Sequence, residues 1–261
     1  MSLLKDLQFG LEGYSKANKF IFKHKLQYFY LVPLVLSIVL LISGFSLTGM
    51  LNDLLWERLQ EWWDPDSWDF WGAEFLSGFL SVLIWLVFRI LFFLIYAFVG
   101  GYVILIIMAP VLAYISEKTE SIILGTDFPF SWSQFFKDIF RGIVLAIRNF
   151  FIEILATIVL FFLSFVPLLG FVTGPLLFGI SAYFYGFSFM DYTAERRKMK
   201  VKESVDFVKQ NRGIAIANGG IFALFLLIPF IGVTIATFIA INSTVAASIS
   251  ILKKENSSLE L

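Results

Sequence analysis

Two long apolar stretches dominate the first half of the chain. Residues 28–50 carry no charge over about 23 residues, enough for a helix to cross a hydrocarbon core of ~30 Å. Residues 75–110 are apolar over a longer distance, so a helix there would tilt or project beyond the bilayer. The pattern predicts two transmembrane helices.

Proline and glycine interrupt the apolar blocks in the second half. The run Leu155–Asp191 breaks near its middle, and a helix in lipid tolerates such a break only where protein or water covers the freed backbone groups. A P-x-x-G sequence recurs in both blocks between two apolar runs, which indicates an internal repeat. We expect two helical hairpins, residues 141–190 and 214–252. Their tips contain Pro167, Gly170, Gly174, Pro175, Pro229 and Gly232.

Charge placement predicts how these hairpins enter the membrane. Lysines and arginines gather in the N-terminal segment, in residues 196–212 and near the C-terminus, whereas the first loop carries only Arg58. The positive-inside rule therefore places both termini in the cytoplasm, and each hairpin enters and leaves on that side. Residues 214–228 give a helix of roughly 22 Å, which is short of the bilayer and favours re-entrant half-helices. The first hairpin is also long enough for two full crossings.

The N-terminal segment, residues 1–27, alternates apolar residues and lysines at helical spacing. This spacing predicts an amphipathic helix at the membrane interface, with its lysines toward lipid headgroups. An ordinary amphipathic helix packed on protein fits the pattern equally well. The apolar positions are Leu3, Leu4, Leu7, Leu11, Tyr14, Ala17 and Ile21.

Composition agrees with an all-α integral membrane protein. Hydrophobic residues make up 59% of the chain, above the roughly 45–50% of soluble proteins. The 20 basic and 20 acidic residues cancel, and nothing indicates nucleic acid as a partner. There is no cysteine, His24 is the only histidine, and no nucleotide-binding glycine motif occurs. We therefore expect no enzyme, no catalytic residue, no metal and no cofactor.

The loop between the first two apolar stretches is rich in acids and tryptophans. Tryptophans mixed with acids are typical of an aromatic belt at the non-cytoplasmic face, which we favour over a carboxylate metal site. The residues concerned are Asp53, Trp56, Glu57, Glu61, Trp62, Trp63, Asp64, Asp66, Trp68, Asp69, Trp71 and Glu74.

Three arginines lie within or beside the apolar segments. Arg89 falls near the middle of the second stretch, where a charge costs at least ~2.5 kcal/mol and needs a partner. Arg141 and Arg148 are seven residues apart and so lie on one helical face. Each arginine is either an anion ligand or a structural ion-pair partner, and Glu153 is a candidate partner for Arg89 or Arg148.

Four stretches resemble the CysZ family of bacterial sulfate transporters, which is related to the etoposide-induced-protein membrane family. They are YFYLVPL at residues 28–34, MAPVLAYISEKTE at 108–120, FVPLLGFVTGP at 165–175, and the Asp191-Tyr192 pair followed by RG-x₄-NG at 212–219. The resemblance covers nearly the whole chain. It implies two long transmembrane helices, two partly inserted helical hairpins, and assembly into homo-oligomers.

One departure from the family pattern concerns the anion site. Relatives carry a Gly-hydrophobic-Arg-Arg signature before the first membrane helix, and its arginines contact sulfate. The corresponding residues here are Lys25, Leu26, Gln27 and Tyr28, so both arginine positions are uncharged. Gln27 still donates hydrogen bonds and Lys25 supplies charge, but a fork that grips an oxyanion from two sides is lost.

Two functions follow from these observations. The first is an inner-membrane transporter or channel for a small inorganic oxyanion, sulfate by resemblance, with Lys25, Gln27, Arg89, Arg141 and Arg148 as candidate substrate-binding residues. The alternative is a non-transporting protein that organises membrane lipid or protein partners, with the basic segment 196–212 on anionic headgroups.

Overall fold

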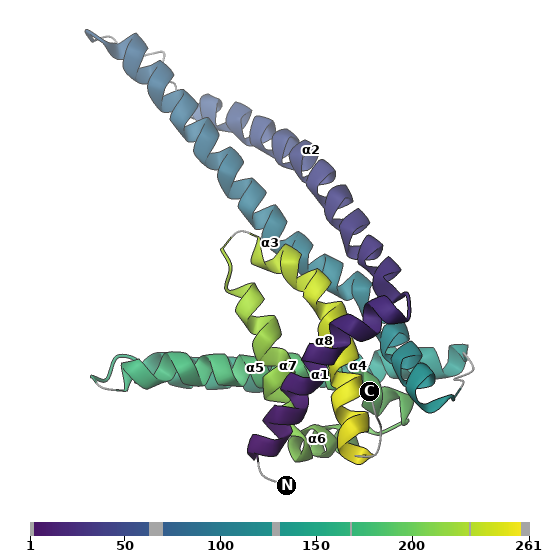
Figure 1. Ribbon diagram of the computed structural model, residues 1–261. Helices are drawn as coiled ribbons and strands as arrows, with labels where there is room; N and C mark the ends of the chain where they lie inside the picture. The colour runs from purple at the N-terminus through teal and green to yellow at the C-terminus, as the bar shows by residue number, and fades with distance from the viewer. Residues whose placement is uncertain (1–2, 63–69, 127–130, 168, 230, 257–261) are drawn as a thin grey trace. The chain divides into compact units, whose positions relative to one another are not determined.

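The computed structural model describes residues 3–62, 70–126, 131–167, 169–229 and 231–256, and these are helical with short connections. The helices form two compact units. One unit joins residues 1–31 to residues 108–261, and we call it the hairpin unit. The other, residues 32–107, we call the long-helix unit (Figure 1).

The long-helix unit consists of most of α2 (Leu31–Trp62) and the first part of α3 (Ala73–Leu124). Small residues allow these helices to approach. A Cβ added to Gly44 would lie 2.6 Å from the Tyr96 ring, and one added to Gly100 would lie 2.1 Å from Leu40 Cδ1. Ser43 Oγ and the Tyr96 hydroxyl form a hydrogen bond of 2.6 Å across the same contact.

Both long helices continue beyond the ends expected from the sequence. Helix α2 runs past Met50 to Trp62, because the residues that follow are mostly good helix formers even though several are polar. Helix α3 passes through Pro110 to Leu124 instead of ending there. Pro110 removes one backbone hydrogen bond, whereas ending the helix would free several backbone groups at once. The core of the predicted tryptophan and acid loop, residues 63–69, lies outside the described residues.

The hairpin unit contains α1 (Leu3–Lys23), the short 3₁₀ helix η1 (Leu26–Tyr30) and the end of α3. Two helical hairpins follow. The first pairs α4 (Trp132–Leu163) with α5 (Gly170–Arg196), and the second pairs α7 (Arg212–Leu226) with α8 (Gly232–Glu255). Helix α6 (Val201–Gln210) connects them. Figure 1 shows the two hairpins running in clearly different directions.

The two P-x-x-G sequences have the same role in both hairpins. The glycine is the first residue of the second helix each time, Gly170 in α5 and Gly232 in α8. A Cβ on Gly170 would lie 2.9 Å from the Ser164 carbonyl oxygen, and one on Gly232 would lie 2.7 Å from the Phe225 carbonyl oxygen. Glycine is therefore required where the chain folds back onto the preceding helix. Pro175, by contrast, lies within α5.

Helix α8 is the centre of the hairpin unit. Its residues from Ala236 to Leu252 are mostly buried, including the hydroxyl residues Thr244, Ser248 and Ser250. Thr244 and Ser250 donate to carbonyls one turn earlier, and Ser248 bonds Ser116 of α3 at 2.8 Å. Small side chains of this kind let neighbouring helices approach closely.

Helix α5 crosses α7 through two matching small-residue pairs. Ala182 and Gly186 of α5 face Ala215 and Gly219 of α7, each pair four residues apart. A Cβ on Gly186 would lie 1.9 Å from the Ala215 carbonyl oxygen, and one on Gly219 would lie 1.8 Å from that of Ala182. The two backbones are therefore in direct contact, as in small-xxx-small packing of membrane helices.

Helix α1 packs on α7 and α8 through small residues rather than leucines. Its buried positions are Asp6, Gly10, Gly13, Ala17 and Ile21, whereas Leu4 and Leu11 are 72% and 54% exposed. The helix therefore packs on protein, which was one of the two interpretations of the apolar spacing, but its contact uses Gly10 and Gly13 in place of the leucines. Its position at a lipid surface stays a prediction.

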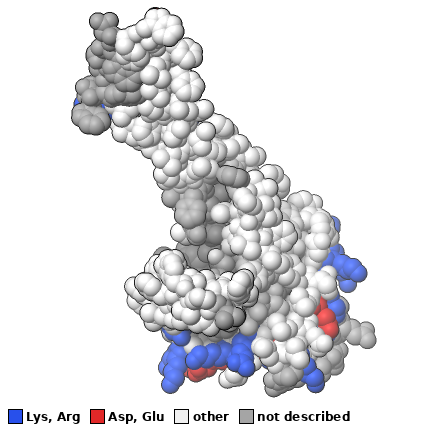
Figure 2. Space-filling view, turned by 90° about the vertical axis from the view of Figure 1, so that its left-hand side faces the viewer, with Lys and Arg blue, Asp and Glu red and all other residues white. Residues whose placement is uncertain are grey.

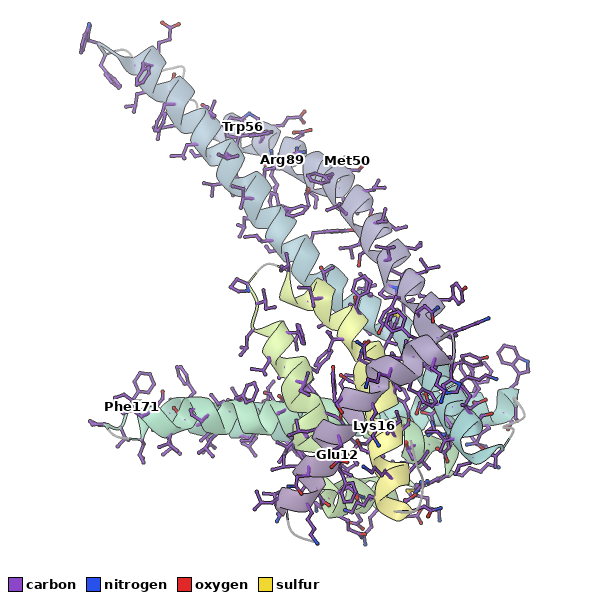
Figure 3. All side chains as sticks on the ribbon, viewed as in Figure 1. Glu12, Lys16, Met50, Trp56, Arg89 and Phe171 are labelled. Atoms are coloured by element: carbon purple, nitrogen blue, oxygen red, sulfur yellow. The ribbon has the colours of Figure 1, made fainter. Side chains whose placement is uncertain are left out.

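Five helical segments are long and apolar enough to cross a membrane, counted over the described residues. They are residues 26–59 (η1 with α2), the first part of α3, α4, α5 and α8, while α7 is shorter. Figure 3 shows Phe171, which is 87% exposed, at the tip of the α4–α5 hairpin. Exposed apolar side chains coat this hairpin on several sides, as expected for helices in contact with lipid.

Candidate anion-binding residues

Arg141 is held by a dense set of acceptors. Its guanidinium donates to both carboxylate oxygens of Asp191 on α5, at 2.6 and 3.2 Å, and its Nε donates to the Met199 carbonyl at 2.7 Å. The Ser204 hydroxyl of α6 accepts a further hydrogen bond. Arg141 and Asp191 are only 10% and 13% exposed. This arginine therefore joins α4, α5 and α6, and most of its donors are occupied.

Arg148 lies two turns further along α4 and makes fewer hydrogen bonds than Arg141. Its Nη1 donates to the Asn149 amide oxygen at 2.8 Å, and the described residues provide no carboxylate for it. Glu153, the partner considered from the sequence, accepts a hydrogen bond of 2.7 Å from Ser181 instead. Arg148 thus carries a partly buried charge without a carboxylate partner in the described chain.

Lys25 and Gln27 lie together at the turn between α1 and η1. Lys25 is exposed and adopts the left-handed conformation, with φ 59°. The Gln27 side-chain oxygen is buried and has no hydrogen-bond partner among the described residues. Burial and the neighbouring Lys23 lower the pKa of His24, so its imidazole is neutral at pH 7. The positive charge at this turn therefore comes from lysines.

Arg89 belongs to the long-helix unit. Figure 3 shows its side chain on the side of α3 that faces α2, where its guanidinium approaches Gly49. Its Cζ also lies 5.5 Å from the centre of the Trp85 ring, a cation–π contact. It has no hydrogen bond or ion pair with the described residues. The buried amide of Asn52, one turn beyond Gly49, likewise has no partner there.

Sequence reasoning missed a second buried ion pair in the hairpin unit. Arg196, read as part of a basic loop, donates through Nε and Nη2 to Glu120 at the end of α3. Its Nη1 donates to Ser116 at 2.5 Å, and both ionic side chains are less than a tenth exposed. These residues are 76 positions apart, so only three-dimensional proximity reveals the pair.

Three further ion pairs gather at the end of α8. Lys253 pairs with Glu12, Lys254 lies 2.8 Å from Asp6, and Arg197 makes a two-pronged contact with Glu255 at 2.6 and 2.7 Å. They join the first half of α1 and the end of α5 to the end of α8. Most lysine and arginine side chains visible in Figure 2 lie in its lower part.

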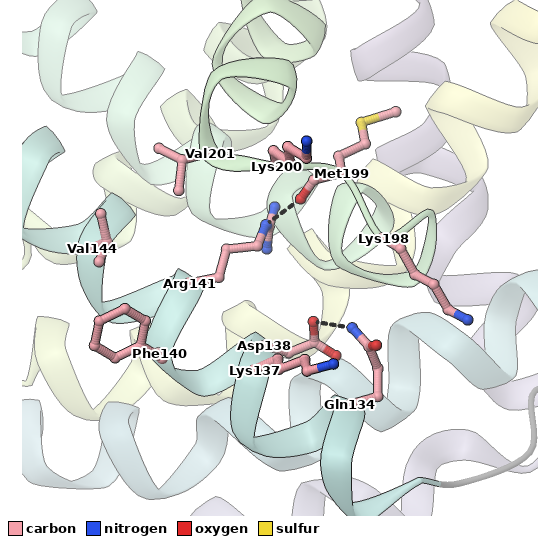
Figure 4. Close-up of a pocket in the computed structure, with 10 residues that line it drawn as sticks. All are labelled: Gln134, Lys137, Asp138, Phe140, Arg141, Val144, Lys198, Met199, Lys200 and Val201. Carbon is pink, nitrogen blue, oxygen red and sulfur yellow. Dashed lines mark hydrogen bonds between the residues drawn. The ribbon is translucent and has the colours of Figure 1, made fainter.

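A shallow pocket of about 430 Å³ lies beside Arg141 (Figure 4). It opens between the start of α4 and the chain that connects α5 to α6. Three lysines contribute to its lining, and two of them, Lys198 and Lys200, belong to the basic segment 196–212. The lining residues are Gln134, Lys137, Asp138, Phe140, Arg141, Val144, Lys198, Met199, Lys200 and Val201.

The described residues contain no cluster of histidines and acids that could hold a metal ion. The candidate residues fall into three groups: Lys25 with Gln27, Arg141 with Arg148 on α4, and Arg89 in the other unit. Gly174 has open space around it, with no atom within 4 Å of an added Cβ.

Comparison with known proteins gives one consistent answer. Residues 14–236 match the family described as "Sulfate transporter CysZ/Etoposide-induced protein 2.4". A sulfate transporter CysZ of Pseudomonas fluorescens strain Pf0-1 is 29% identical over 82% of this chain and 83% of the relative. One from Pseudomonas aeruginosa strain LESB58 is 30% identical over 85% of this chain and 87% of the relative.

These matches agree with the apolar helices of the structure, and together they identify a multi-pass membrane protein of a transporter family rather than an enzyme. The chain belongs to the sulfate transporter CysZ/etoposide-induced protein 2.4 family.

Proposed function

We propose that this protein conducts a small inorganic oxyanion across a bacterial inner membrane, and that this oxyanion is sulfate. Relatives named sulfate transporters match more than four fifths of the chain, which supports this substrate. A dianion that crosses lipid needs arginine, lysine and backbone N–H groups to replace its water. The alternative, a protein that only organises lipid or partners, is not favoured by these relatives.

The observation that carries the proposal is that the Arg89 guanidinium has no ion-pair partner among the described residues. Its charge lies in the apolar first part of α3 without a carboxylate among the described residues, and such a charge is costly in a membrane. An anion beside Arg89 would compensate this charge. The unpartnered amide of Asn52 is a further donor on the facing helix.

The remaining candidates receive different roles. Lys25 and Gln27 are assigned to the entry, because the exposed Lys25 ammonium supplies positive charge there and the Gln27 side-chain NH₂ group can donate hydrogen bonds. Arg148 is assigned to a later contact because no carboxylate neutralises it in the described chain. Arg141 acts as a structural residue, since Asp191, Met199 and Ser204 occupy its donors.

Membrane topology is part of the proposal. The ion pairs of Glu12 with Lys253 and Asp6 with Lys254 link the first half of α1 to the end of α8, which supports both segments lying on the same side of the membrane. The positive-inside rule assigns that side to the cytoplasm. Helix α7 has 15 residues, or roughly 22 Å, so the α7–α8 hairpin re-enters rather than spans. We further propose that the chain works as a homo-oligomer in contact with membrane lipid.

Sulfate uptake into liposomes that contain the purified protein tests the proposal. We expect flux in the native protein, a loss of at least about tenfold in Arg89→Gln, and no loss in Lys209→Gln, which removes an exposed cation outside the family stretches. A further variant, Gln27→Arg with Tyr28→Arg, restores the family's arginine pair and should increase flux. Absence of sulfate flux in folded native and restored proteins would overturn the proposal.

A further inference from the structure

The pocket beside Arg141 has two chemically distinct walls (Figure 4). Lys137 from α4 and Lys198 and Lys200 from the α5–α6 connection supply positive charge. Phe140, Val144 and Val201 supply apolar surface. A ligand that fits both walls combines a negative group with a hydrocarbon part.

The positive charge of the pocket is largely uncompensated. The three lysine ammonium groups make no ion pair within the described residues. Asp138 is the acid in the lining, and one of its oxygens accepts a hydrogen bond from Gln134 at 2.7 Å. Asp191 neutralises Arg141, so the excess charge belongs to the lysines.

The geometry of the pocket is fixed in advance of binding. Nε of Arg141 donates to the Met199 carbonyl and so ties the α5–α6 connection to α4. Lys198 adopts φ 54°, in the left-handed region that lysine rarely occupies, and its N–H donates to the Glu195 carbonyl at 2.8 Å. The Met199 N–H donates to the Ala194 carbonyl at 3.1 Å, so Lys198 ends α5 in the left-handed conformation common at helix C-termini and the chain that carries Lys198 and Lys200 has a defined direction.

An exposed aromatic ridge runs beside the pocket. Trp132, Phe136 and Phe140 are 66%, 63% and 70% exposed and lie four residues apart on α4. The Trp132 and Phe136 rings stack with centres 6.2 Å apart. Exposed aromatic side chains next to lysines are characteristic of the membrane–water boundary.

We propose that this pocket binds one anionic phospholipid. Its phosphate lies among Lys137, Lys198 and Lys200, and an acyl chain follows Phe140 and Val144. This function is independent of anion transport, because it uses none of the residues assigned to the transport path. Free sulfate or phosphate would satisfy the lysines but would leave the apolar wall empty.

The test measures phosphatidylglycerol binding to the detergent-purified full chain by native mass spectrometry, with phosphatidylcholine as the neutral comparison. The triple variant Lys137→Gln, Lys198→Gln, Lys200→Gln should bind phosphatidylglycerol at least about tenfold more weakly. Lys19→Gln, Lys202→Gln, Lys209→Gln removes the same charge from exposed positions outside the pocket and should bind as the native protein does.

Two further measurements separate a lipid from a soluble anion. Phe140→Ser should weaken phosphatidylglycerol binding while the lysines remain, and millimolar inorganic phosphate or sulfate should compete poorly. Equal losses in the two triple variants would overturn the proposal. So would full competition by inorganic phosphate together with unchanged binding in Phe140→Ser, because that combination defines a site for free anions.

Discussion

The Arg141 guanidinium of α4 grips the Asp191 carboxylate of α5 with two hydrogen bonds, although the residues are 50 positions apart in the sequence. Both side chains are nearly buried, and the Ser204 hydroxyl and Met199 carbonyl complete the arrangement. Arg141 therefore joins α4 to α5 near the open end of the first hairpin and holds the connection from α5 to α6 in place. It therefore also determines the position of two pocket lysines.

Breaking this pair from one side leaves a buried charge without compensation. Asp191→Asn should lower the free energy of unfolding by about 3–5 kcal/mol, seen as a lower midpoint in thermal unfolding in detergent. Asp206→Asn, at an exposed position on α6, should have little effect. The double variant Arg141→Met, Asp191→Leu removes both charges and should be more stable than Asp191→Asn alone. Equal midpoints for Asp191→Asn and Asp206→Asn would contradict a structural role.

The α5–α7 crossing predicts a contrast between two glycines of one helix. Gly186→Ala places a methyl group 1.9 Å from the Ala215 carbonyl oxygen, so the helices must separate, at a cost of about 1–3 kcal/mol. Gly179→Ala meets nothing within 4 Å and should be neutral or slightly stabilising. Thermal midpoints of both variants check this. A neutral Gly186→Ala would show that the two backbones are not in contact.

The pair Glu12 with Lys253 predicts an acid-dependent contribution to stability. The hydrogen bond from Lys253 lowers the pKa of Glu12 below its usual 4.5. Because the folded-state pKa is depressed, the contribution is present above pH 4.5 and disappears as the pH falls through the lower folded-state value. The pair is exposed, so we expect less than about 1 kcal/mol. Native protein and Glu12→Gln should differ in thermal midpoint at pH 7 and converge in acid; a constant difference would refute the assignment.

Much of the helical architecture could be predicted because it depends on local pattern. A helix in lipid needs a long uncharged run, and in both hairpins a P-x-x-G sequence lies where the chain reverses direction. Both hairpins could therefore be predicted from the sequence. The contacts of α1 were not, because helices that touch backbone to backbone use Gly10 and Gly13 rather than the leucines that periodicity highlights. The predicted helix ends at Met50 and Pro110 were wrong, because α2 and α3 continue to Trp62 and Leu124. The length of an apolar run shows how much of a helix can lie in lipid, but a helix can continue into polar residues beyond it.

The candidate site shows a similar division. Single charges such as Arg89 stand out in an apolar run, and their residue type predicts anion chemistry. The ion-pair partners of the arginines could not be predicted. Arg141 and Asp191 are 50 positions apart in the sequence, and Arg196 and Glu120 are 76 positions apart. Two of the three pocket lysines, Lys198 and Lys200, belong to the basic segment 196–212 that predicted topology, and Lys137 had no assigned role. Their shared cavity depends on the left-handed turn at Lys198, which no composition reveals.

Two asparagines on neighbouring helices provide a final contrast. Asn218 of α7 is fully buried and neither of its amide atoms has a partner in the described chain, whereas Asn242 of α8 accepts a hydrogen bond of 2.5 Å from the Tyr30 hydroxyl. Burying an unpaired amide costs free energy, and a leucine of similar size avoids that cost.

Asn218→Leu should therefore raise the free energy of unfolding by about 1 kcal/mol, while Asn242→Leu should lower it by a similar amount because the Tyr30 hydroxyl loses its acceptor. Thermal midpoints in detergent compare the two. If Asn218→Leu destabilised the protein, its amide would have a polar partner in the membrane, and sulfate flux in the same variant would then show whether that partner is the transported anion. Unchanged flux in a destabilised Asn218→Leu would instead assign the partner to bound water.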